Sequence, residues 1–199
     1  MTKSERTRQF IVEKTAPLFN KKGFDGTTLS DLTEVTGLTK GALYGNFIDK
    51  DEIAMEAFRH SAARVKEMVK NHLEGADTYK KRLTLLLEFF AAYVFEPPVP
   101  GGCPLLNSAI EVDDYRTSMR KMVATELVQT VEFIAGLLRK GVLAKEFRAD
   151  IKPKQLAYIF FCSVEGALMF SRTAKSREPM DVIVKHSKGI LDEISIKKI

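Results

Sequence analysis

The residues best suited to chemistry lie in "GLTKGALYGNFIDK", residues 37–50. Gly41 and Gly45 fall in a segment only long enough for two turns of helix, where each glycine costs about 1 kcal/mol relative to alanine. A helix that only had to pack would not need them. A lysine, a tyrosine and an asparagine stand beside these glycines and supply a positive charge and hydrogen-bond donors. The combination predicts a helix whose backbone approaches another molecule closely.

Two short helices are expected to position these residues, one over 28–36 and one over 39–46. Thr28 with Asp31 forms a capping box, and Gly37 between the helices suits a left-handed C-cap. Thr39 can cap the second helix, and Asp49 with Glu52 is expected to form a capping box at the start of the next one. This is a helix-turn-helix layout, and its outward face offers small and polar side chains to a DNA groove. The residues predicted on that face are Thr39, Lys40, Gly41, Ala42, Tyr44 and Asn46. The alternative is an ordinary helical hairpin whose polar residues are solvated.

The rest of the chain also has helical periodicity, so the sequence predicts an all-α protein. A first helix over about 4–22 contains Pro17, which predicts a kink near Glu13. A functional boundary is predicted near residue 48, giving a DNA-binding domain over 1–48 and a helical bundle over 49–199. The bundle helices are expected over about 50–73, 79–96, 104–113, 115–140, 153–174 and 179–195.

Composition and charge narrow the class of protein. The chain has 199 residues, of which 45% are hydrophobic and 29% charged, and a net charge of +5 that mildly favours a polyanionic partner. Cys103 and Cys162 lie far apart, which indicates a reducing compartment. The N-terminus has no apolar core of a signal peptide, and the longest apolar run is too short to span a bilayer. A cytoplasmic protein without membrane contact is expected.

An enzyme is the rival class, and the sequence disfavours it. His60, His72 and His186 are widely separated and show no metal-ligand spacing. The chain has no phosphate-binding glycine loop, no G-x-S-x-G motif and no C-x-x-C pair. No catalytic residue, metal site or cofactor is therefore predicted.

Residues 8–58 resemble the DNA-binding domain of TetR-family transcriptional regulators. The matching segments are the end of the first helix ("LF…G"), the "TT" before the second, "GLTKGALY" in the third, and "NF…K" leading into the fourth. One departure is Thr33, where the family usually has alanine. The resemblance implies an all-helical homodimer, with a helix-turn-helix domain that binds double-stranded DNA and a larger domain that binds a small molecule. The DNA contacts it implies by matching position are Thr28, Thr39, Lys40, Gly41, Tyr44, Asn46 and Lys50.

Candidate ligand-binding residues lie on helices expected to line the bundle interior. Glu111 and Glu165 stand among apolar neighbours, where an unpaired charge would be costly. They could pair with buried donors, cap a loop or meet a ligand. Most of the apolar candidates could equally be core. The full candidate set is Phe89, Phe90, Tyr93, Asn107, Glu111, Met122, Phe133, Phe161 and Glu165.

The last two helices carry small and apolar residues suited to a four-helix interface between two copies, although packing within one chain is an alternative. The predicted interface residues are Ile159, Phe160, Ser163, Gly166, Ala167, Phe170, Val182, Ile183, His186 and Ile190. The predicted function is a repressor that leaves an inverted-repeat operator when a largely apolar inducer binds. The alternative is a helix-turn-helix regulator without a small-molecule ligand, whose bundle serves only dimerisation or protein partners.

Overall fold

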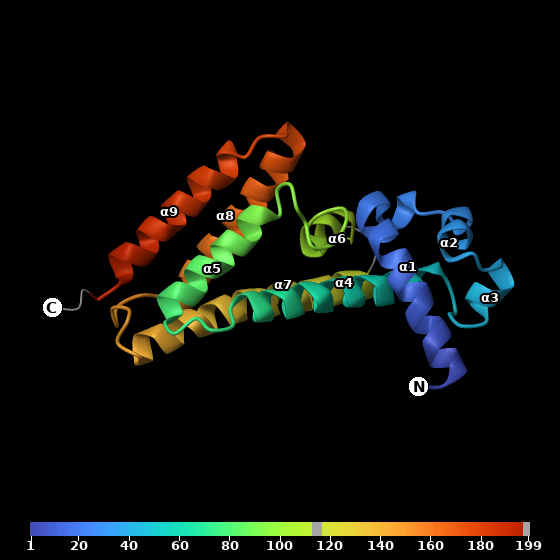
Figure 1. Cartoon of the computed structure of the whole chain (residues 1–199), viewed down its shortest axis with the longest axis horizontal. Helices are drawn as coiled ribbons and strands as arrows, with labels where there is room; N and C mark the ends of the chain where they lie inside the picture. The colour runs from blue at the N-terminus through green and yellow to red at the C-terminus, as the bar shows by residue number, and fades with distance from the viewer. Residues whose placement is uncertain (113–116, 197–199) are drawn as a thin grey trace. The chain divides into compact units, whose positions relative to one another are not determined.

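In a computed structural model of the chain, residues 1–112 and 117–196 are described (Figure 1). The predicted helix ends at residues 113 and 115 lie outside these ranges. The described residues contain no β-strand, only an isolated β-bridge between Phe147 and Ser195. Their helices are α1 (Lys3–Gly26), α2 (Leu29–Thr36), α3 (Lys40–Tyr44), α4 (Lys50–His72), α5 (Tyr79–Ala92), α6 (Pro104–Val112), α7 (Thr117–Leu143), α8 (Pro153–Ala174) and α9 (Glu178–Ile194).

The all-α prediction is confirmed, and the packing divides the chain into two compact units. The first unit comprises Met1–Glu67 and Pro97–Ala124, and the second comprises Met68–Glu96 and Thr125–Ile199. This division differs from the functional boundary predicted at residue 48. The first unit takes in most of α4, the whole of α6 and the start of α7 together with the helix-turn-helix.

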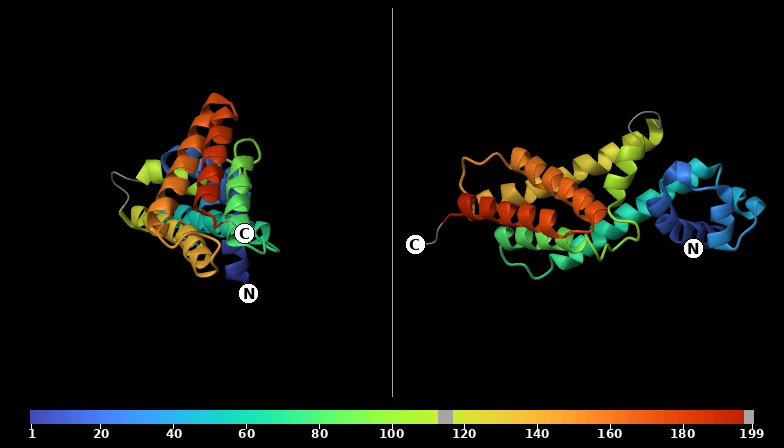
Figure 2. Two further views of the ribbon diagram at one scale, coloured as in Figure 1. Left: turned by 90° about the vertical axis from the view of Figure 1, so that its left-hand side faces the viewer. Right: turned by 90° about the horizontal axis from the view of Figure 1, so that it is seen from above.

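In the first unit, α1, α2 and α3 lie close together (Figure 2), and their buried side chains form a small apolar core. Ile11 of α1, Leu32 of α2 and Leu43 of α3 are each fully buried, and Phe19 and Phe47 are nearly so. Burying a leucine or isoleucine side chain stabilises the fold by about 1.5–3 kcal/mol. These contacts hold α3, which has only five residues and could not persist as an isolated helix.

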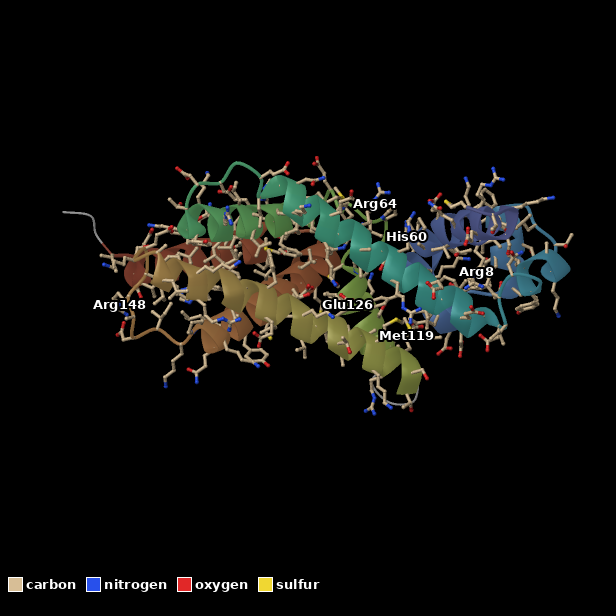
Figure 3. The ribbon with its side chains drawn as sticks, turned by 90° about the horizontal axis from the view of Figure 1, so that it is seen from below. Arg8, His60, Arg64, Met119, Glu126 and Arg148 are labelled. Carbon is tan, nitrogen blue, oxygen red and sulfur yellow. The ribbon has the colours of Figure 1, made fainter. Side chains whose placement is uncertain are left out.

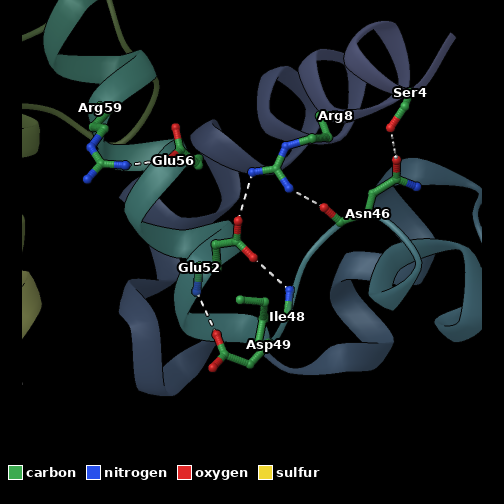
Figure 4. Close-up of polar contacts among 8 residues, drawn as sticks. All are labelled: Ser4, Arg8, Asn46, Ile48, Asp49, Glu52, Glu56 and Arg59. Atoms are coloured by element: carbon green, nitrogen blue, oxygen red, sulfur yellow. Dashed lines mark hydrogen bonds and ion pairs between the residues drawn. The ribbon is translucent and has the colours of Figure 1, made fainter. Parts of the chain in front are cut away.

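The helix starts in this unit follow the predicted capping chemistry. The Thr28 hydroxyl accepts a hydrogen bond from the Asp31 N–H, and the Thr39 hydroxyl accepts one from the Ala42 N–H. Gly37 closes α2 in the left-handed conformation, with φ 68°. At the start of α4, the Glu52 N–H donates to Asp49 (2.8 Å; Figure 4). All three predicted N-caps are therefore confirmed.

Helix α1 breaks where the first helix was predicted to end, but not near Glu13. The only non-helical backbone angles within α1 are at Gly23, with φ 77° and ψ 177°, and Pro17 lies inside the helix without such a break. The kink expected near Glu13 is therefore not seen as a break in the backbone angles, whereas the break at Gly23 agrees with the predicted helix end at residue 22. The positive φ at Gly23 belongs to a region that glycine adopts freely and other residues rarely do.

The second unit is built on α5, α8 and α9. α8 and α9 lie side by side, and α5 packs against both (Figure 1). Leu138, Leu168 and Leu191 are almost fully buried in its core. Arg172 of α8 donates to the carbonyl of Tyr93, just after α5, at 3.2 Å. Among the described residues, no helix has both the length and the apolar character that crossing a membrane requires.

Candidate DNA interface and ligand cleft

Helix α3 presents a continuous polar face to solvent. Thr39, Lys40, Gly41 and Tyr44 are exposed, whereas Leu43 on the opposite side is fully buried. The Lys40 ammonium lies 6.0 Å from the centre of the Tyr44 ring. A positive charge and a phenol hydroxyl therefore stand together on a short helix that the core holds in place. This arrangement can donate hydrogen bonds to a polyanion.

Gly41 of α3 and Gly45, which caps the end of α3, have different surroundings. A Cβ on Gly41 would meet only the Thr39 hydroxyl oxygen, at 4.0 Å, and would otherwise lie in open space. A Cβ on Gly45 would lie 3.2 Å from the carbonyl oxygen of Gly41, which is a tight contact. The fold therefore explains Gly45 but does not explain Gly41. A close approach from outside remains the reason proposed for Gly41 alone.

Two of the predicted DNA contacts are also engaged within the protein. The Asn46 side-chain amide donates to the Ala42 carbonyl at 2.9 Å. The Lys50 ammonium donates to the carbonyls of Phe24 (2.6 Å) and Thr27 (2.8 Å). An ammonium group has three N–H donors, so these bonds do not use the full capacity of Lys50. Contacts of Asn46 and Lys50 with DNA stay predictions.

The remaining predicted contacts are Thr28 and Ala42. Thr28 is exposed, and its hydroxyl also donates to Asp31 at 2.9 Å. The Lys22 ammonium beside Asp31 and the hydrogen bonds from Thr28 lower the pKa of Asp31 to about 2. Ala42 is half-buried. Thr28 therefore holds the start of α2 in place whether or not it also meets DNA.

Arg8 of α1 fixes the segment between α3 and α4 and was not predicted from the sequence. Its guanidinium forms an ion pair with Glu52 at 2.8 Å and donates to the Asn46 carbonyl (Figure 4). It also lies 4.1 Å from the centre of the Phe47 ring. The Ile48 N–H and then Arg8 lower the pKa of the Glu52 carboxyl. The available signal was spacing, because Arg8 lies three residues before the buried Ile11 and so shares its face.

An apolar cleft lies within the second unit, between α5, α7 and α8. Its cavity volume is about 20 Å³, room for about one water molecule, so the lining side chains nearly fill it in this conformation. Three predicted ligand residues, Phe90, Phe161 and Glu165, come together there. Glu165 is only 8% exposed and is the one ionisable residue of the lining. The lining residues are Leu83, Leu86, Leu87, Phe90, Ile134, Phe160, Phe161, Val164 and Glu165.

Two further predicted ligand residues pack next to this cleft without lining it. Phe89 and Tyr93 have ring centres 5.6 Å apart, and both contact Phe90. Tyr93 is fully buried, so it acts as core. The Phe89 ring also lies 5.5 Å from the His72 ring. These aromatic contacts support one wall of the cleft.

The structure places the other predicted ligand residues elsewhere. Phe133 is 45% exposed on α7, because it lies about 100° around the helix from its neighbour Ile134, which does line the cleft. Asn107, Glu111 and Met122 belong to the first unit. There the Glu111 carboxylate accepts hydrogen bonds from the N–H groups of Phe24 and Asp25. The structure therefore does not bring these four residues to the cleft that Glu165 lines, and their contact with a ligand stays a prediction.

The residues predicted at the dimer interface differ in how far their side chains are exposed in one copy of the chain. Ile159, Phe170 and Val182 are 48%, 59% and 59% exposed, which is unusual for large apolar side chains. Gly166 and His186 are also exposed, and Ser163, Ile183 and Ile190 are half-buried. Phe160 and Ala167 are only 4% and 5% exposed because they lie on the face of α8 that packs into its own chain. Both are corrected from interface to core.

Among the described residues, the ionisable side chains form no metal-binding cluster. In the part of the chain that the structure describes, no three His, Cys, Asp or Glu residues are grouped to hold a metal ion. His60 lies on α4, one turn from Arg64 (Figure 3), His72 ends the same helix and His186 lies on α9.

An all-helical chain whose helix-turn-helix exposes a polar, small-residue helix belongs to the class of DNA-binding transcriptional regulators. Residues 11–57 match the family "Bacterial regulatory proteins, tetR family", and residues 80–187 match "Tetracyclin repressor-like, C-terminal domain". The second match alone spans more than half of the chain. The protein belongs to the TetR family, as the resemblance of residues 8–58 implied.

Solved structures and curated relatives agree with this assignment. A TetR-family regulator from Cytophaga hutchinsonii is 37% identical, with a TM-score of 0.92 over 100% of this chain and 99% of that one. A TetR regulator from Chloroflexus aurantiacus J-10-FL is 32% identical, with a TM-score of 0.92 over 98% of each chain. The HTH-type transcriptional repressor DhaR of Mycobacterium sp. (strain GP1) is 25% identical over 87% of this chain and 86% of that protein.

Proposed function

We propose that the protein is a homodimeric repressor that binds an inverted-repeat operator and is released by a small, largely apolar inducer. The observation that carries the inducer is the second-unit cleft, whose lining is apolar except for Glu165. Because its cavity volume is only about 20 Å³, the inducer is proposed to bind a more open conformation of these helices. We further propose that the protein has no catalytic activity and acts in the cytoplasm, where a bacterial regulator meets its DNA.

The operator part of the proposal rests on α3. A helix of five residues reads only a few base pairs, so two copies related by two-fold symmetry are needed for specificity. Similar proteins support this role. DhaR and the Escherichia coli protein NemR are named as repressors, and the regulator CifR has been crystallised with a 26-bp operator duplex.

The inducer part rests on the chemistry of the cleft. Phe90 and Phe161 offer apolar contact area, and the Glu165 carboxylate favours a cationic or hydrogen-bond-donating group. A ligand can change DNA affinity only if it binds one conformation of the protein better than another. The inducer is therefore expected to be an amphiphile with an apolar body and one donor group.

Selection from a random 30-bp duplex library tests the operator. The selected sequences are expected to share an inverted repeat whose half-sites are about 10 bp apart or a multiple of that, matching successive turns of the major groove. Selected sequences without two-fold symmetry would contradict the dimeric mode of binding. The same pool supplies a defined duplex for the inducer experiment.

A panel of apolar amines and quaternary ammonium compounds then tests the inducer by release of that duplex. Compounds that release DNA are expected to lose at least about tenfold in potency against Glu165→Gln, which keeps the side-chain shape but removes the charge. Glu88→Gln, an exposed change on α5, is the matched control. If no compound in the panel releases the duplex, the ligand-free regulator is the better description. If Glu165→Gln leaves potency unchanged, Glu165 is structural.

A further inference from the structure

The C-terminal end of α1 contains a break whose hydrogen bonds are completed by another helix. In an unbroken α-helix, the Phe24 N–H would donate to the Asn20 carbonyl four residues earlier. Because Gly23 is not helical, the Phe24 N–H instead donates to the Glu111 carboxylate at 2.8 Å. The Asn20 carbonyl accepts from the Asn107 side-chain amide at 3.0 Å. Helix α6 thus supplies both the missing acceptor and the missing donor.

Asn107 and Glu111 are placed for this by their spacing on α6. They lie four residues apart, so both side chains leave the same face of the helix. α6 lies beside the end of α1, and the two helices are in contact (Figure 1). The other Glu111 oxygen accepts from the Asp25 N–H at 3.0 Å. One carboxylate therefore satisfies two consecutive backbone N–H groups beyond the break.

The approach of α6 to α1 is too close for other residues at two positions. A Cβ on Gly23 would lie 2.6 Å from a Glu111 carboxylate oxygen, and one on Gly101 would lie 2.6 Å from the Asn20 carbonyl oxygen. The Asn20 side chain also donates to the carbonyls of Pro100 and Gly102, each at 2.9 Å. The chain before α6 is therefore fixed to α1 as firmly as α6 itself.

The same turn of α1 also holds the first residue of α4. The Lys50 ammonium donates to the carbonyls of Phe24 and Thr27. Glu111 thus binds the N–H groups of this turn and Lys50 binds its carbonyls, so each charge meets the backbone groups of opposite polarity. The turn connects α6 to the start of α4, which follows directly after the helix-turn-helix.

We propose that Asn107 and Glu111 are positioning residues for DNA binding. By completing the hydrogen bonds across the break, they set the direction of the last turn of α1. Through Lys50, that turn sets where α4 begins, and with it the segment that leads out of α3. The proposal goes beyond the operator and inducer proposed above and depends only on DNA binding by the helix-turn-helix.

Glu111→Gln is the variant that tests it. Glutamine keeps the shape, but it places an amide where one of the two N–H groups needs an acceptor. Hydrogen exchange over residues 20–27 is expected to accelerate. Affinity for the duplex selected above should fall at least about fivefold, the lower end of usual coupling between sites. The salt dependence of binding should stay the same, because no phosphate contact is lost.

The direction in which operator affinity changes in Glu111→Gln separates a positioning effect from an electrostatic one. Removing a negative charge from a DNA-binding unit should by itself strengthen binding to a polyanion. Glu13→Gln is the matched control, because Glu13 is exposed on α1 and the charge change is identical. This control is expected to bind the duplex as well as the unchanged protein or slightly better. Only a loss of positioning makes Glu111→Gln bind more weakly.

Each other outcome would overturn the proposal. If Glu111→Gln showed faster hydrogen exchange but the same operator affinity as Glu13→Gln, the hydrogen bonds of Asn107 and Glu111 across the break would have only a structural role. Unchanged exchange would mean that the hydrogen bonds do not hold the turn in solution. Circular dichroism and thermal unfolding establish that the variant is folded at the assay temperature. If Glu111→Gln does not fold, Asn107→Ala replaces it. This variant removes the hydrogen bond to the Asn20 carbonyl and leaves the Glu111 carboxylate in place, and its hydrogen exchange and operator affinity are expected to change in the same directions.

Discussion

Gly41 is the residue on which the close-approach argument now depends. The fold leaves open space where its side chain would be, whereas Gly45 is explained by the tight contact with the Gly41 carbonyl. Gly41→Leu should therefore change the helix-turn-helix stability by no more than about 1 kcal/mol in either direction, because leucine has the higher helix propensity.

Affinity for the selected operator should nevertheless fall at least about 30-fold in Gly41→Leu, since a leucine side chain would hold the helix away from the base edges. Fluorescence anisotropy with a labelled duplex measures this effect. Gly136→Leu, a helical glycine on α7 in the second unit, is a control for the substitution itself. If Gly41→Leu and the unchanged protein bound the operator with equal affinity, the proposal that Gly41 allows α3 to approach DNA closely would be wrong.

Asp31 gives α2 a pH-dependent stability. Its pKa is lowered from 3.8 to about 2, first by Lys22 and then by Thr28. A lowered pKa means that the folded state favours the charged form, so the contribution is present above pH 3.8 and is lost as the pH falls toward 2. Asp31→Asn should lower the thermal midpoint at pH 7, and its difference from the unchanged protein should shrink below about pH 4. Glu34→Gln, an exposed change on the same helix, should show no such trend.

At the scale of elements, two glycines with positive φ in the helix-turn-helix region, Gly23 and Gly37, predict different costs of substitution. A Cβ added at Gly37 (φ 68°) would have nothing within 4 Å, so Gly37→Ala should cost only the backbone strain of about 1–2 kcal/mol. Gly23→Ala should cost more, because its Cβ would also meet the Glu111 carboxylate. Urea unfolding measures both. In a Glu111→Ala background the cost of Gly23→Ala should decrease, and an unchanged cost would mean that the contact is not felt.

The elements themselves were largely predictable from the sequence. Thr28, Thr39 and Asp49 signal helix starts through chemistry confined to four residues, and the structure has each cap. The buried faces of α1 to α3 follow the apolar spacing. The break at Gly23 matches the predicted end of the first helix at residue 22. The sequence could not show that Glu111, which lies far along the chain on α6, supports this break.

The site residues were predictable only where local spacing decides exposure. The α3 face follows from Leu43 being buried, so its neighbours point outward. Glu111 and Glu165 both stand among apolar residues, and the sequence could not tell that one binds backbone N–H groups of α1 while the other lines a cleft. Phe160 was predicted at the interface but is buried, and Phe133 was predicted to bind ligand but is exposed. Both differences arise because a shift of one position around a helix moves a side chain from core to surface.

At the scale of the whole molecule, the exposed apolar side chains of α8 and α9 predict the assembly. Phe170 and Val182 are each 59% exposed, and Ile159 is 48% exposed, on helices that pack side by side. A second copy of the same surface would bury them and would pair two recognition helices by two-fold symmetry. Phe170→Asp should therefore convert a dimer at micromolar concentration into a monomer, because it would bring two carboxylates into an apolar contact.

Sedimentation velocity measures the assembly, and operator binding shows what the dimer is for. A Phe170→Asp monomer should lose at least about 100-fold in affinity for the full inverted repeat, since each half-site is then bound without its partner. Its affinity for a single half-site should equal that of the unchanged protein, because α3 lies in the other unit and is not altered. Phe133→Asp, an equally bulky and exposed change on α7, tests whether the loss is specific to the α8–α9 surface. A Phe170→Asp protein that stays dimeric would place the interface elsewhere, and a monomer that still binds the full repeat tightly would contradict recognition by a dimer.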